Sequence, residues 1–387
     1  MKNLIKSIFV LLFLNLNIVF SQLNINLSYN GYADNNLFRS PQPISDFLSS
    51  VKLGTSYRFD KEGLTIYNNI NLLGYKEYSE RNFLINNVGL LKHFKLGENQ
   101  FSNMYLGSNW NLRVNKKDYE YYNYSQLSGY LNLQLFTKIA LFKGGYSYRW
   151  REYINWSDLS NHLHNAFIQI NKSLPTRTTI ILETGFGNKS FLGKDSMTST
   201  IKTGRGNGMR SETSTFTEAI SKSLNTSQFN LTLRLSQSIN DKTGLFVQYR
   251  KQISMDDETS YQNFDDYYQD DELFDDPFTF ESDEYSTQLT FILPKSSKML
   301  VGGSYHDKNY ISEIIFVDEN DVIGTEDLRI DKQYNYFFDL SKIINVQKDW
   351  LNSIKLNIYY TYSNNESNSY WYNYKNSAFG GGIQINF

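Results

Sequence analysis

The sequence predicts an all-β protein: a single transmembrane antiparallel β-barrel of about 16 strands, within a range of about 14 to 18. Three observations lead to this prediction. Apolar and polar residues alternate along many segments, short turns alternate with long polar loops, and no segment after the N-terminus has the ~18 to 20 apolar residues of a spanning helix. The mean hydropathy of -0.49 fits this class, because only every second strand residue faces lipid.

The N-terminus predicts a secretory signal peptide over residues 1–21, which leaves residues 22–387 to form the barrel. Lysines precede the short apolar run Ile8–Leu14, and Val19 and Ser21 occupy positions suited to cleavage. An uncleaved membrane anchor is the alternative, but this apolar run is shorter than a spanning helix.

Alternation with a period of two predicts strands that have one apolar and one polar face. Residues 51, 53, 55, 57 and 59 are Val, Leu, Thr, Tyr and Phe, whereas Lys, Gly, Ser and Arg stand between them. The predicted strands are 22–33, 47–59, 64–74, 83–95, 101–113, 122–135, 139–150, 161–173, 177–188, 225–239, 243–254, 281–293, 297–310, 328–343, 352–363 and 371–387.

The connections between these strands distinguish a membrane barrel from a soluble sandwich. Short links such as 60–63 and 294–296 alternate with long polar links such as 189–224 and 255–280. Short periplasmic turns and long extracellular loops are typical of outer-membrane barrels. An even strand count places both termini on the periplasmic side. A soluble sandwich that packs its aromatics in a core is the alternative, but it would be atypically large.

Closure of the sheet follows from backbone hydrogen bonding. Hydrocarbon offers no water, so every backbone N–H and C=O group must be paired within the protein, which only helices and closed barrels achieve. Aromatic residues near the predicted strand ends, among them Trp110 and the ranges 146–150, 359–362 and 370–374, fit the girdles at the two membrane interfaces.

Two segments resemble known proteins. The final stretch Gly-Gly-Gly-Ile-Gln-Ile-Asn-Phe387 resembles the C-terminal signal of outer-membrane barrels, which implies recognition by the barrel assembly machinery. The stretch from Tyr32 to Ser40, directly after the first strand, resembles the opening of β-barrel porins. The bias toward Asn, Lys, Ile and Tyr resembles outer-membrane proteins of Bacteroidota type.

The polar face of the predicted strands carries many cations. A charge that faces lipid costs roughly 2 to 4 kcal/mol at the midplane, so these side chains are expected to line the pore, where Glu183 and Asp339 are the clearest acids. A cationic wall favours anions. The alternative is that the cations pair with loop acids. The predicted pore-lining residues are Lys52, Arg58, Arg113, Lys143, Arg149, Arg234, Arg250 and Lys355.

The two longest loops differ in charge. Loop 189–224 is rich in Lys and Arg, whereas loop 255–280 is rich in Asp and Glu. We expect them to dock, with one of them folded into the mouth of the pore. Clustered carboxylates also make loop 255–280 a weak Ca²⁺ candidate, although a solvated acidic face is the commoner outcome. The candidate ligands are Asp265, Asp266, Asp270, Asp271, Asp275 and Asp276.

No pattern of catalytic residues emerges, so we expect no enzyme, no cofactor and no metal site beyond that loop. Ser304 and His306 share a strand face, but nothing nearby supplies the orienting group of a triad. His162 and His164 are too few ligands for a closed metal site. The net charge of -2 excludes the basic excess of nucleic-acid binding.

The sequence therefore predicts a channel of the cell outer membrane for passive diffusion of small hydrophilic solutes, preferring anions. Its expected partners are outer-membrane lipid, lipopolysaccharide and the assembly machinery that recognises the Phe387 strand. The alternative is a barrel component of a secretion, polysaccharide-export or surface-adhesion assembly, in which the aromatic and acidic loops are the binding surface.

Overall fold

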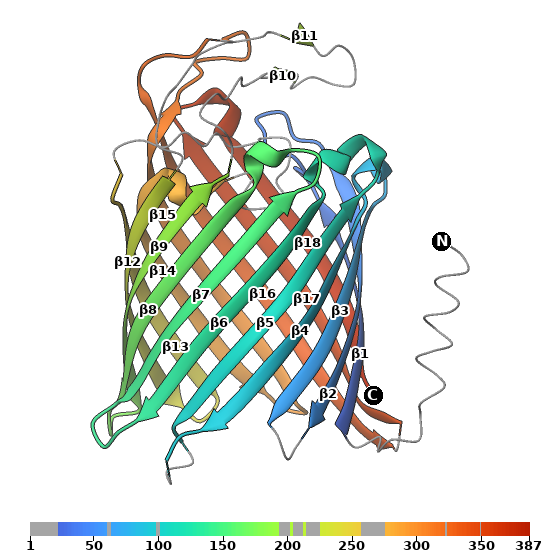
Figure 1. Ribbon diagram of the computed structural model, residues 1–387, viewed down its shortest axis with the longest axis vertical. Coiled ribbons are helices and arrows are strands. Elements are labelled where there is room, and N and C mark those ends of the chain that lie inside the picture. Colours follow the sequence, from blue (N-terminus) through green and yellow to red (C-terminus); the bar gives the residue numbers. More distant parts are fainter. Residues whose placement is uncertain are drawn as a thin grey trace.

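Sixteen strands close into one antiparallel barrel, as the sequence predicts (Figure 1). The computed structural model describes residues 22–59, 63–97, 101–192, 202–203, 212–213, 225–256, 275–321, 323–348 and 350–387. The expected signal peptide lies outside the described residues. The described part of the chain holds no helix with the length and apolarity needed to span a bilayer.

Every strand pairs with the next one in the chain, except that β9 pairs with β12 and β1 closes the barrel against β18. The barrel strands are β1 (Leu23–Asp34), β2 (Asp46–Phe59), β3 (Leu64–Tyr75), β4 (Phe83–Lys95), β5 (Asn103–Asn115), β6 (Tyr124–Phe136), β7 (Leu141–Tyr153), β8 (Asn161–Ser173), β9 (Thr178–Phe191), β12 (Asn225–Asn240), β13 (Thr243–Ser254), β14 (Phe280–Leu293), β15 (Ser297–Ile314), β16 (Leu328–Lys348), β17 (Leu351–Ser367) and β18 (Tyr374–Asn386).

The connections follow the predicted alternation. One rim carries short turns and the C-terminus, and the other carries the long loops (Figure 1). The turn before β15 reverses the chain with positive φ at Lys295 and Ser296. The long loops contain β10 (Lys202–Thr203), β11 (Glu212–Thr213) and the 3-10 helices η2 (Ser79–Arg81), η3 (Lys117–Tyr122), η4 (Ser157–Leu159), η5 (Pro277–Thr279) and η6 (Tyr370–Tyr372).

The predicted strand bounds need correction near the C-terminus. β16 runs five residues beyond the predicted end at 343, and β15 continues to Ile314. The last strand starts at Tyr374, later than the predicted 371, because Tyr370–Tyr372 forms η6. Tyr372 and Tyr374 are buried and do not belong to an interfacial girdle, because the Tyr372 ring lies against the buried Arg329 and Tyr374 belongs to a buried cluster with Leu37.

The outward face of the barrel is an exposed apolar band. Leu53, Leu131, Leu233 and Ile358 are between 38% and 48% exposed although each lies in the middle of a strand. A water-soluble sheet would bury such side chains in a core. The band therefore matches a surface that is covered by lipid.

Two rows of side chains mark the upper edge of this band over β13 to β17. Four tyrosines lie directly opposite one another on neighbouring strands: Tyr249, Tyr285, Tyr305 and Tyr334. One step nearer the long-loop rim stands a charged row: Lys251, Asp283, Asp307, Lys332 and Glu366. A row of tyrosines next to a row of charged residues is the arrangement expected at the boundary between the hydrocarbon core and the lipid headgroups.

On the inward face, several aromatic rings lie over a glycine of the neighbouring strand. A Cβ atom at Gly89 would overlap the Tyr67 ring, and one at Gly107 would overlap the Tyr130 ring. Each pair is directly opposite in register. Because the ring fills the space that a side chain would take, it lies against the wall and leaves the lumen wide.

Replacement of Gly107 by valine should displace the Tyr130 ring. We expect Gly107→Val to lower the free energy of unfolding by ~1 to 3 kcal/mol through overpacking. Adding Tyr130→Ala should restore part of that loss. Gly129 faces outward and its Cβ position meets only a carbonyl oxygen at 3.9 Å, so Gly129→Val is the matched control. Equal loss in both valine variants, measured by thermal unfolding in detergent, would contradict the packing argument.

Candidate functional site

The register of the barrel places all eight sequence-predicted cations on the same, inward face. Directly opposite residues share a face, so the assignment passes from strand to strand around the closed sheet. Thr232, for example, lies opposite Glu183 on one side and Arg250 on the other. The same register extends to Lys52, Arg58, Arg113, Lys143, Arg149, Arg234 and Lys355.

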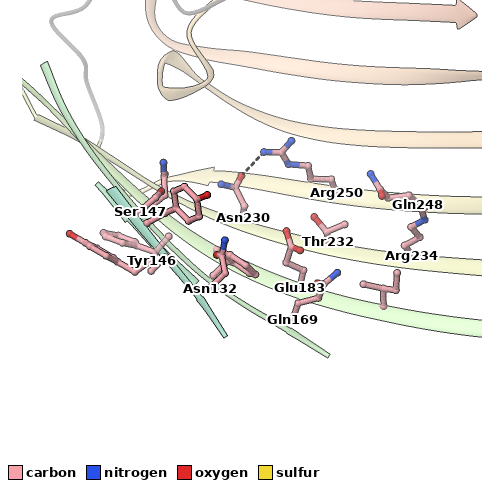
Figure 2. Close-up of a pocket in the computed structure, with 17 residues that line it drawn as sticks. Asn132, Tyr146, Ser147, Gln169, Glu183, Asn230, Thr232, Arg234, Gln248 and Arg250 are labelled. Atoms are coloured by element: carbon pink, nitrogen blue, oxygen red, sulfur yellow. Dashed lines mark hydrogen bonds between the residues drawn. The ribbon is translucent and has the colours of Figure 1, made fainter. Parts of the chain in front are cut away.

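A cavity of about 650 Å³ lies on the inner wall between β6 and β13. Figure 2 shows Glu183, Thr232, Arg234 and Arg250 pointing from the strands into this space. Its other polar lining residues include Asn132, Ser147, Gln169, Asn230 and Gln248. Polar groups from six neighbouring strands thus face one wet space, as transport of hydrophilic solutes requires.

Two guanidinium groups are held in place on this wall. The carbon Cζ of Arg234 lies 3.8 Å from the centroid of the Phe246 ring. Arg250 donates through Nη2 to Oδ1 of Asn230 at 3.5 Å, as drawn in Figure 2. Neither guanidinium group forms an ion pair within the described residues, although Glu183 lines the same cavity. Both positive charges therefore remain available to a solute.

The end of loop 255–280 folds inward at the long-loop rim. Asp276 forms a buried ion pair with Lys189, and Asp275 pairs with Lys308. The side-chain amides of Gln228 and Gln252 donate to the Pro277 carbonyl at 2.5 and 2.7 Å. These contacts reach β9, β12, β13 and β15, so η5 is anchored against the inner wall of the mouth. Lys189 was predicted to open loop 189–224 but lies within β9, so its pair with Asp276 joins that strand to the end of loop 255–280.

A third buried cation, Arg329, lies beside this anchor. Arg329 is 2% exposed and pairs with Glu313 at 2.8 Å and with Asp331. Its Cζ lies 3.2 Å from the centroid of the Tyr372 ring. Removal of a partner from such a buried charge is costly, since the charge cannot be solvated. The cluster of Arg329 with its two carboxylate partners and Tyr372 therefore holds the ends of β15 and β16 against η6.

The carboxyl of Asp275 stays ionised in this setting. Burial by itself raises the pKa, but the positive charges of Lys308 and Arg329 and hydrogen bonds from Lys308 and Tyr310 outweigh it and lower the pKa to about 2. The Tyr310 hydroxyl donates to Asp275 at 2.6 Å. A depressed pKa stabilises the fold above the ordinary value of 3.8, and this stabilisation is lost as the pH falls through about 2.

Loop 35–45 also folds inward, on another side of the mouth. Leu37 is fully buried and packs with Leu48, Tyr75, Phe83 and Tyr374. Leu48 and Phe83 belong to the inward face of their strands. Inward-packed loops and the ionic anchor together line the entrance at the long-loop rim.

Sequence reasoning missed several inward charges. Lys189 was expected in a loop but lies within β9, whereas Lys308, Arg329 and Glu284 lie at inward positions of predicted strands. The alternation of inward and outward positions along each strand is the sequence signal that identifies them. Partners in loop 275–279 and in the extension of β15 to Ile314 cannot be found from this alternation, because they depend on long-range folding.

The Ca²⁺ candidate falls mostly outside the described residues, which exclude Asp265, Asp266, Asp270 and Asp271. Asp275 and Asp276 are described and bind lysines. Within the described ranges no three His, Asp or Glu residues are placed to hold a metal ion.

The paired Ser304 and His306 both face inward. The Ser304 hydroxyl accepts a hydrogen bond from the Asn335 amide at 3.3 Å. The His306 ring packs edge to face against Phe280, with the centroids 5.8 Å apart. These contacts give the two side chains structural partners of their own.

Comparison with known proteins supports the fold. No family model matches the chain, and no curated protein does either. The structure is similar to OccAB4 of Acinetobacter baumannii, with a TM-score of 0.50 and 10% identity over 95% of this chain and 99% of that one. OpdL of Pseudomonas aeruginosa matches with a TM-score of 0.42 and 10% identity over 95% and 98%. The fold is a closed antiparallel barrel like that of outer-membrane porins.

Neutralising Asp275 should loosen the mouth. We expect Asp275→Asn to destabilise the protein by about 3 kcal/mol, because Lys308 is left as a buried, unpaired charge. Asp283→Asn is the control variant. The ion pair of Asp283 with Lys251 faces outward and both side chains are about one third exposed, and such pairs contribute only about 0 to 1 kcal/mol.

The same pair predicts a pH dependence. The stability difference between wild type and Asp275→Asn should persist from pH 7 to pH 5 and disappear as the pH falls through about 2. Unfolding in urea across this range measures it. A difference already absent at pH 5 would show that Asp275 is not held ionised by Lys308 and Arg329.

Proposed function

We propose that the chain is a porin-like channel of the cell outer membrane, through which small hydrophilic solutes diffuse passively. The observation that carries this proposal is a closed sheet with an exposed apolar outer band and a wet inner wall. Barrels of 16 to 18 strands leave room for an aqueous channel, whereas eight strands are filled by side chains. No reaction is part of this function.

The proposal extends to a mild preference for anions. Arg234 and Arg250 project into the wall cavity without an ion pair within the described residues, and Lys143 shares their face. Positive side chains in a narrow, low-dielectric space raise the local concentration of anions. Glu183 and Glu284 oppose this effect, which keeps the preference mild.

Insertion and orientation complete the proposal. Residues 1–21 direct secretion and are cleaved, and the Phe387 strand is recognised by the barrel assembly machinery of a Bacteroidota-type bacterium. The short-turn rim and both termini face the periplasm, and the long loops face outward. The tyrosine and charged rows over β13 to β17 then lie at the lipopolysaccharide leaflet.

The second candidate is a barrel that serves as one part of a secretion, polysaccharide-export or surface-adhesion assembly. The length of β15, β16 and β17 favours it: these strands have 18, 21 and 17 residues, whereas most others have 12 to 14. A bilayer crossing needs only ~9 to 11 residues. The excess strand provides a wall on which a partner can dock.

Planar-bilayer recording tests the channel. We expect discrete current steps and a reversal potential that shows anion preference. Arg250→Gln should lower the chloride to potassium permeability ratio about twofold, since it removes one wall charge. Lys251→Gln is the matched control: the net charge changes equally, but Lys251 faces outward and pairs with Asp283 at 2.7 Å. Absence of current steps from correctly folded protein would overturn the channel in favour of the assembly component.

A further inference from the structure

One row of the inner wall consists almost wholly of carboxamide side chains. It crosses β18 and β1 to β6, and its members lie directly opposite one another on consecutive strands. We call it the amide row. Its residues are Asn386, Asn26, Gly54, Asn69, Asn87, Asn111 and Gln126.

The glycine does not interrupt the amide row. A Cβ atom at Gly54 would lie 2.6 Å from Nδ2 of Asn26 and 2.9 Å from Oδ1 of Asn69. The two amides therefore lean over Gly54 from both sides and occupy its place. Because neighbouring strands lie about 4.8 Å apart, amide groups follow one another at nearly regular steps.

The amide row runs along the pore as well as around it. It begins at Asn386, the last residue of β18 on the short-turn rim, and reaches Gln126, near the start of β6 on the long-loop rim. Strands tilt against the barrel axis, so a row that crosses them at right angles climbs the wall (Figure 1). At its upper end, Gln126 accepts a hydrogen bond from Arg151 at 2.9 Å.

The opposite wall carries a different row. There Lys143, Glu183, Arg250 and Glu284 lie in one line of directly opposite residues, with Gln169 and Thr232 between them. Charged groups alternate in sign along that line, whereas the amide row from Asn386 to Gln126 holds no ionisable side chain. The two rows therefore suit solutes of different chemistry.

Amides match hydroxyl groups. A carboxamide carries donors and an acceptor without a net charge, and a hydroxyl group is also both donor and acceptor. The Oδ1 atoms of Asn87 and Asn111 are buried, so these two residues act through their N–H groups, which donate to hydroxyl oxygens. A polyhydroxylated chain can exchange its hydrogen bonds with water for bonds to one amide after another, with little change in energy at each step. Tyr67 adds an apolar ring beside the row, directly opposite Gly89. Anionic solutes gain more from positively charged side chains such as Arg250 in the other row.

We propose that the amide row is a track that binds neutral oligosaccharides and guides them through the lumen. This inference rests on the proposed channel function for passage, but binding of the sugar is independent of it.

The test measures binding and current block separately. Maltohexaose is titrated into the folded protein in detergent by calorimetry, and its block of the ion current is recorded in planar bilayers. The row variant combines Asn69→Ala, Asn87→Ala and Asn111→Ala. The control variant combines Asn165→Ala, Asn171→Ala and Asn335→Ala, three inward asparagines outside the row. A polyethylene glycol of similar size, which lacks the chain of hydroxyl groups, serves as the control solute.

We expect maltohexaose to bind the wild type and the control variant alike, and the row variant at least about tenfold more weakly, which corresponds to ~1.4 kcal/mol. The polyethylene glycol should not bind. The Gly54→Leu variant, whose side chain would push Asn26 and Asn69 apart, should also bind maltohexaose more weakly than the wild type. It replaces the triple variant if that variant does not fold.

Equal binding by the row and control variants, or no binding by the wild type, would overturn the track. Sugar binding without any current steps would retain the track and overturn the channel. Current steps without sugar binding would retain the channel and overturn the track.

Discussion

The pairing of the first strand with the last is the constraint on which the rest of this structure depends. β1 bonds to β2 along one edge and to β18 along the other, from Asn26 opposite Asn386 to Asp34 opposite Ala378. Without this closure both strands would present unpaired N–H and C=O groups to lipid, at a cost of several kcal/mol for each group. Closure also creates the lumen, since it gives every inward side chain a place on one continuous wall.

Closure fixes the chemistry of both faces. A shift of one residue in register would move each strand's polar side chains to the lipid side, so the alternation of polar and apolar residues fixes the register. The register in turn determines which residues lie side by side in a row. The tyrosine and charged rows outside, and the amide row inside, are consequences of the same pairing. At the mouth the rule changes: there Asp275, Lys308 and Arg329 hold the loops by buried ion pairs.

Much of the barrel was predictable because alternation is a local signal. The predicted bounds of 83–95, 161–173 and 243–254 agree with β4, β8 and β13 residue for residue. The inward placement of Arg234 and Arg250 follows from parity within their strands. The predicted 371–387 was less accurate, because η6 forms only where Asn365 and Arg329 bind Tyr372.

The mouth and the amide row were not predictable for a different reason. Lys189 and Asp276 are 87 residues apart in the chain, and neither position shows a pattern that names its partner. The amide row collects one residue from each of seven strands, so it exists only once the register between strands is known. Asparagine in a single predicted strand indicates a wet face and no more.

Labelling along one strand tests the central claim most directly, and the absence of native cysteine makes it clean. Single cysteines at successive positions from Phe229 to Leu235 of β12 would be treated with a membrane-impermeant maleimide, with the protein inserted in lipid vesicles. The account predicts that positions 230, 232 and 234 react from the water-filled lumen and that 229, 231, 233 and 235 are protected by lipid. Uniform reactivity, or the opposite alternation, would contradict a closed barrel with a wet interior.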